Sequence, residues 1–96
     1  MTAKELNKMS FNNLSTLSAD VINGMAETEL RKIDAAVLNN INEDEFIRLS
    51  VKVFECLSYK QFKRIYQNRI KSIPPRTAMK MTNKTFKKFK KAVFGK

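Results

Sequence analysis

Hydrophobic residues recur along this chain with a spacing of sixteen residues. Cut at Met9, Met25, Ile41 and Leu57, the sequence gives consecutive sixteen-residue segments without a gap, and after the insert IPPRTAMK a further segment begins at Met81. The sixth position is apolar in every copy, and these residues are Leu14, Leu30, Phe46, Phe62 and Phe86. The first, ninth and fourteenth positions behave in the same way. This agreement predicts a repeated structural unit.

Polar residues near the ends of each segment predict where helices begin and end. The second position mostly holds N-cap residues, and Ser58 with Gln61 has the spacing of a capping box. Asn23-Gly24 and Asn39-Asn40, at the segment ends, are typical helix breakers. Each unit is therefore predicted to be a cap, about three turns of helix and a tight turn, with its apolar positions on one face.

The tenth position leaves an alternative open. Ser18, Asp34 and Ser50 are cap-type residues close to the apolar stripe, where a straight helix would half-bury them. Apolar residues also recur every eight residues from Met9 to Ile73. A continuous helix cannot sustain four residues per turn, so each unit is either one interrupted helix or two short ones.

The sequence thus predicts an all-α protein without a β-sheet, in a single domain of residues 1–96. We expect a small array or bundle of four to six short helices built on the sixteen-residue repeat, with Pro74-Pro75 ending the fourth unit inside a connector. An ordinary bundle of equally long helices is the alternative. The residues expected to be largely buried are Leu14, Leu30, Phe46, Phe54, Phe62, Ile65 and Phe89.

Charge divides the chain into two halves. The formal net charge is +10. Residues 1–56 carry six bases and nine acids, a net charge of −3, and residues 57–96 carry thirteen bases and no acid, a net charge of +13. The C-terminal half is therefore expected to attract polyanions.

The basic residues of the C-terminal half form the candidate site. In TFKKFKKAVFGK at the end of the chain, and in the fourth segment, the cations fall opposite the apolar residues on a helical wheel. Because lysine outnumbers arginine, we expect non-specific contacts to nucleic-acid phosphates. Lys84, Lys87 and Lys88 are expected to face solvent. Arg69, on the apolar side, is expected to pair with an acid. The candidate residues are Lys60, Lys63, Arg64, Lys71, Arg76, Lys80, Lys84, Lys87, Lys88 and Lys91.

Other partners fit parts of the same pattern. FKKFKKAVF has the composition of a basic amphipathic helix that lies on an anionic membrane. Short helical repeats also suit an adaptor or effector-like module that binds an acidic protein surface. The acidic half could bind the basic half of another copy, giving self-association. Against the membrane, Phe86, Phe89 and Phe94 match core positions, and side chains that pack inward cannot insert into lipid.

Catalysis has little support in the sequence. Histidine is absent, Cys56 is a lone cysteine, and no nucleotide-binding or zinc pattern occurs. We therefore expect no enzymatic activity, cofactor or metal. With no apolar stretch long enough to span a bilayer and no signal-peptide pattern, the protein is expected to be intracellular, in the cytoplasm or with nucleoid or nuclear material.

Overall fold

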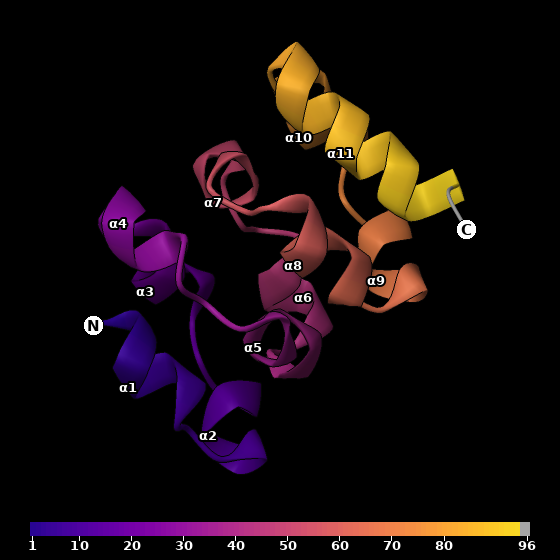
Figure 1. The fold of residues 1–96 in the computed structure, drawn as a ribbon. Coiled ribbons are helices and arrows are strands. Elements are labelled where there is room, and N and C mark those ends of the chain that lie inside the picture. Colours follow the sequence, from indigo (N-terminus) through magenta and orange to yellow (C-terminus); the bar gives the residue numbers. More distant parts are fainter. Residues whose placement is uncertain (95–96) are drawn as a thin grey trace.

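Residues 1–94, which the computed structural model describes, form eleven helices and no strand (Figure 1). The helices are α1 (Ala3–Asn7), α2 (Phe11–Ser15), α3 (Ala19–Asn23), α4 (Glu27–Leu30), α5 (Ala35–Asn40), α6 (Glu43–Phe46), α7 (Val51–Glu55), α8 (Tyr59–Arg64), α9 (Gln67–Lys71), α10 (Pro75–Met79) and α11 (Asn83–Phe94). In Figure 1 the indigo helices α1 and α2 lie in the lower part, α5, α6 and α8 in the middle, and the yellow helix α11 at the top.

The helices of α1–α10 are short because a helix-breaking cap recurs every eight residues. Each spans four to six residues and begins after a residue whose ψ lies between 140° and 165°, far from helical values. These N-cap residues are Thr2, Ser10, Ser18, Ala26, Asp34, Asn42, Ser50, Ser58, Tyr66 and Pro74. Each of the first four predicted units is thus two short helices, whereas the last unit contains the single helix α11, and the expectation of four to six helices is wrong for the described residues. The sixteen-residue repeat itself stays a prediction.

Most of the large core side chains come from two positions at each short helix, although Met1, at the first such position, is 54% exposed. The residue before the N-cap and the fourth helical residue are apolar, the arrangement of a hydrophobic staple. Among the described helices, the buried residues at the fourth position are Leu6, Leu14, Ile22, Leu30, Leu38, Phe46, Phe54, Phe62 and Ile70. Each side chain of this size contributes about 1.5–3 kcal/mol when fully buried. The expected core residues Leu14, Leu30, Phe46, Phe54, Phe62 and Ile65 are buried as predicted.

The orientation of α11 differs from the prediction. Its buried residues are Thr85 and Ala92, Phe89 is only partly buried, and Phe86 and Phe94 are 37% and 79% exposed. The core positions of the earlier segments belong to helices that break every eight residues. At about 100° per residue, a continuous helix places Thr85 and Ala92 on nearly the same side, whereas Phe94 lies about 180° and Phe86 about 100° from Thr85. The side of α11 that faces the core is therefore that of Thr85 and Ala92.

The predicted connector IPPRTAMK is largely helical. Pro74-Pro75 follows the end of α9, as expected, but Pro75 is also the first residue of α10. Proline suits this position because its missing N–H would have no partner within the helix and its φ is already helical. The double proline therefore joins two helices directly instead of opening a loop.

Three asparagine side chains each bridge to the backbone of a segment that lies 25 to 27 residues later in the sequence. The side-chain amide of Asn23 donates to the carbonyl of Arg48 (3.2 Å), and its side-chain oxygen accepts from the backbone N–H of Ser50 (2.8 Å). Asn7 bridges residues 32 and 34 in the same way, and Asn39 bridges residues 64 and 66. These asparagine bridges set residues 25 and 27 positions apart side by side.

We predict that Asn23→Ala destabilises the fold by about 1–3 kcal/mol, because it leaves two backbone groups without their partner. Urea unfolding followed by circular dichroism measures the change. Asn68→Ala is the matched control, since Asn68 is exposed in the middle of α9, and it should change the free energy of unfolding by less than about 0.5 kcal/mol. Equal effects of the two substitutions would contradict a structural role for the bridge.

Candidate nucleic-acid interface

The two basic rows predicted from the sequence lie next to each other in the structure. Helices α8 and α11 pack together. The Tyr59 ring of α8 lies between them, with the Nζ of Lys63 5.9 Å and the Nζ of Lys91 5.0 Å from its centroid. A cation over an aromatic ring gains about 0.5–1 kcal/mol at an exposed site. Tyr59 thus holds together cations that are 28 residues apart in the sequence.

Acidic residues do not neutralise this surface. The ion pairs within residues 1–94 all lie in the first half of the chain: Arg31 with Glu27, and Arg48 with both Asp20 and Glu45. Among the described residues after Leu57, no cation has a carboxylate oxygen within 4.0 Å. Most of the cations of helices α8–α11 are therefore exposed to solvent without an ion pair, an arrangement that favours polyanions.

The structure exposes nearly all of the predicted site residues. Those on the surface are Lys60, Lys63 and Arg64 on α8, Lys71 on α9, Arg76 and Lys80 on and after α10, and Lys84, Lys87 and Lys91 on α11. Lys88 differs from the expectation that it faces solvent: it is partly buried, and its Nζ donates to the carbonyl of Leu57 (3.2 Å). Lys88 therefore helps to hold α11 against the body of the protein.

Two cations are placed differently from the sequence analysis. Lys90 was not predicted, yet it is exposed, with its Nζ 5.6 Å from the centroid of the Phe86 ring. It lies one turn after Phe86, so the wrong assignment of Phe86 to the core concealed it. Arg69 does not pair with an acid in the described chain; its guanidinium lies 5.5 Å from the Phe46 ring centroid and donates to the carbonyl of Leu38 (3.4 Å).

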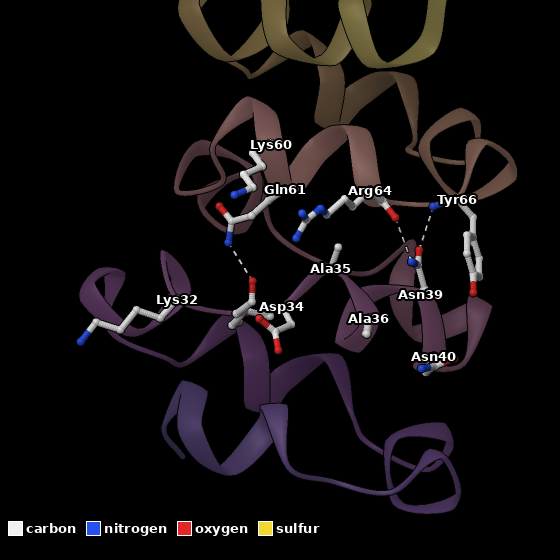
Figure 2. Close-up of a pocket in the computed structure, with 11 residues that line it drawn as sticks. Lys32, Asp34, Ala35, Ala36, Asn39, Asn40, Lys60, Gln61, Arg64 and Tyr66 are labelled. Atoms are coloured by element: carbon white, nitrogen blue, oxygen red, sulfur yellow. Dashed lines mark hydrogen bonds between the residues drawn. The ribbon is translucent and has the colours of Figure 1, made fainter. Parts of the chain in front are cut away.

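A groove of about 580 Å³ opens between α5 and α8 (Figure 2). Its polar lining includes Lys32, Asp34, Asn39, Lys60, Gln61 and Arg64, with Tyr66 at one side. Figure 2 shows the Arg64 side chain extending into the middle of the groove above Ala35. The walls are fixed by the Asn39 bridge and by Gln61, whose side-chain amide donates to the carbonyl of Ile33 (2.7 Å).

Comparison with known proteins adds no family to this picture. No protein-family model matches the chain. No curated protein and no solved structure is significantly similar to it. Within residues 1–94, no helix combines the length and the apolar character needed to cross a membrane. The same part of the chain contains no group of three or more histidine, cysteine, aspartate or glutamate side chains placed to hold a metal ion. The function is therefore argued from the surface itself.

Glu55 anchors the start of α11. Its carboxylate accepts from the backbone N–H of Thr82 (2.7 Å) and from the hydroxyls of Thr82 and Thr85. Desolvation raises the pKa of this carboxyl, but the hydrogen bonds from Thr85 and Thr82 and the charge of Lys88 outweigh it and hold the pKa below its usual value. The last acid of the sequence thus fixes the helix that carries the largest group of lysines.

We predict that Glu55 makes stability depend on pH. Because its pKa is lower in the folded state, the ionised carboxylate adds stability above the unfolded value of about 4.3, and this contribution disappears as the pH falls through the folded value. Urea unfolding between about pH 3 and pH 6 should show a smaller acid-induced loss for Glu55→Gln than for the unmodified protein. The control Glu43→Gln removes an exposed carboxylate and should retain the full loss. An unchanged profile in Glu55→Gln would rule the anchor out.

Proposed function

We propose that this chain is a non-enzymatic nucleic-acid-binding protein that contacts phosphates through the exposed cations of α8–α11. One observation carries the proposal: the cations of α8 and α11 meet at Tyr59, and within the described chain none of them has a carboxylate partner. Adjacent rows of cations suit a regularly charged polymer better than a single small anion.

The chemistry of the side chains favours backbone contact over base recognition. Lysine is a flexible point charge that attracts phosphates without reading base edges, whereas bidentate base contacts mostly use arginine. Binding of this kind releases counterions, so it depends steeply on salt and little on sequence. At physiological salt we expect a dissociation constant of about 10⁻⁴ to 10⁻⁶ M for non-specific sites.

We also propose that the scaffold is a helical-repeat array that spaces these cations. Its support is the eight-residue spacing of the helix starts and the sixteen-residue spacing of Asn7, Asn23 and Asn39, which make the same pair of backbone contacts. Repeat arrays of short helices present extended surfaces to their ligands. An array of this kind would hold the lysines in fixed rows.

The double variant Lys84→Gln/Lys87→Gln should weaken binding to DNA and RNA of any sequence. Each lost phosphate contact flattens the plot of log affinity against log salt by about one unit, so the double variant should lose about two. Fluorescence anisotropy over a series of salt concentrations measures both quantities. Both side chains are exposed, so the fold should be unchanged.

The matched control is Lys4→Gln/Lys8→Gln, which removes the same charge from exposed lysines of the acidic half. It should leave the salt slope nearly unchanged. If both double variants lose the same affinity, total charge governs binding and the interface is misplaced. If the folded protein binds neither DNA nor RNA at low salt, the proposal fails.

An anionic membrane is the second candidate, favoured by apolar side chains that the structure leaves exposed. Met79 is 84%, Phe94 79% and Phe86 37% exposed, and all three lie on α10 and α11 among the lysines. The sequence argument against a membrane assumed that Phe86 and Phe94 pack inward. Exposed apolar groups among cations are the combination that binds anionic lipid surfaces.

If the membrane candidate holds, Met79→Ser/Phe94→Ser should lower co-sedimentation with phosphatidylglycerol vesicles by about tenfold or more, because each substitution removes an inserting apolar side chain. Phe11→Ser is the matched control, since Phe11 is 63% exposed in the acidic half. It should bind the vesicles like the unmodified protein. Absence of vesicle binding at low salt would exclude this candidate.

A further inference from the structure

Three basic residues occupy corresponding places sixteen residues apart. Lys32, Arg48 and Arg64 each offer their backbone carbonyl to the side-chain amide of an asparagine 25 residues earlier. Their carbonyls therefore make the same contact, although Lys32 and Arg48 lie in turns after α4 and α6 and Arg64 is the last residue of α8. The neighbours of one can be compared directly with the neighbours of another.

At the second of these positions, Arg48 forms ion pairs with acids of the same chain. Arg48 lies 3.8 Å from Asp20, which is 28 residues earlier, and 3.2 Å from Glu45, which is three residues earlier. Two carboxylates, one on α3 and one on α6, thus lie beside one guanidinium. Arg48 thus has two carboxylate partners, in exposed pairs of which the side chains of Arg48 and Asp20 are 55% and 78% exposed.

At the third place, both acids are missing. The residues 28 and three positions before Arg64 are Ala36 and Gln61. Gln61 is neutral, and its side chain is occupied by the carbonyl of Ile33 and by the backbone N–H of Ser58. Ala36 has no side-chain oxygen at all, and the groove lies where the acid would extend. In the described structure Arg64 is exposed and has no ion-pair partner.

The rest of the groove suits a phosphate joined to a planar ring. Lys32 and Lys60 also line it against one acid, Asp34, so its charge is positive. Tyr66 is 59% exposed at its side (Figure 2), and a base can stack on such a ring. A volume of about 580 Å³ lies within the range of small-ligand sites, and its walls are fixed by hydrogen bonds.

We infer that the groove between α5 and α8 binds one nucleotide of a single strand, with its phosphate on Arg64 and Lys60 and its base against Tyr66. The inference rests on the proposed function and makes it more specific. Bases of a duplex are stacked and paired, so they cannot turn into the groove without a cost in free energy. A single strand should therefore bind more tightly than a duplex of the same length.

The substitution Ala36→Asp tests the inference without removing a cation. It restores at Arg64 the acid that Asp20 supplies to Arg48, at an exposed position in the first turn of α5 where aspartate is tolerated. Anisotropy with a ten-nucleotide single strand should show about tenfold weaker binding, and a duplex of the same length should change less than twofold. The control Asn12→Asp adds the same charge at the matching position of α2 and should change neither.

A second pair of variants separates the arginine from general charge. Arg64→Gln should weaken single-strand binding by about tenfold, whereas Arg48→Gln, which removes an arginine already paired with acids, should change it less than twofold. Equal losses from Arg64→Gln and Arg48→Gln, or equal losses for single strand and duplex, would overturn the inference.

The base contact has its own test. Tyr66→Leu should weaken binding of the single strand by about tenfold, Tyr66→Phe should retain it, and an abasic strand of the same length should not distinguish the three proteins. If Tyr66→Leu has no effect on the single strand, the base does not lie on this ring.

The two proposals can fail separately. Binding that responds to Lys84→Gln/Lys87→Gln but not to Ala36→Asp or Arg64→Gln would keep the α8–α11 interface and reject the groove. Loss of single-strand binding in Ala36→Asp, with no effect of Lys84→Gln/Lys87→Gln, would keep the groove and reject the interface. Direct binding of phosphatidylglycerol vesicles that is sensitive to Arg64→Gln, without binding of any strand, would reject both.

Discussion

The asparagine bridges are the interaction on which the arrangement of this protein depends. Helices of four to six residues are too short to be stable alone, so each must find its partner in a neighbouring layer. Apolar staples bury side chains, but they do not by themselves fix which two backbone segments are adjacent. The Asn23 bridge fixes this register, because its side-chain amide matches one carbonyl and one N–H two residues apart. A shift by one residue would lose both hydrogen bonds.

The winding of the chain also determines the electrostatics. Because residues 25 to 28 positions apart become neighbours, Lys63 and Lys91 meet over one tyrosine ring, and Asp20 reaches Arg48. Neither contact follows from sequence neighbourhood. The chain separates its charges along the sequence, and the winding then turns that separation into a positive region on the last four helices. The polyanion binding that we propose therefore depends on the fold as well as on the net charge of +10.

The sequence predicted the parts of this structure that depend on local pattern. N-cap residues and apolar periodicity gave an all-helical chain, and residues such as Phe46 and Phe62 are buried as expected. The bridging role of Asn23 could not be predicted, because its partners lie in another layer and the sequence shows only a helix breaker. The exposure of Phe86 could not be predicted either: it is the fourth residue of α11, a position that is buried in α1–α9, but α11 turns Thr85 and Ala92 toward the core instead. The candidate cations could be predicted because they are lysines and arginines. The proposed anion site at Arg64 could not, because it depends on which residues the fold places beside Arg64.

The absence of acids is the more informative part of the charge pattern. A basic residue stands at each of positions 32, 48 and 64, so cations at these places are not special to the basic half. Arg48 and Arg64 differ in their surroundings: Asp20 and Glu45 neutralise the first, and Ala36 and Gln61 leave the second uncompensated. A random excess of lysine would raise the total charge without removing acids from one specific bridged position. The lack of an ion-pair partner at Arg64, although Asp34 lines the same groove, therefore argues for a local anion site, over and above the general attraction of a basic surface for polyanions.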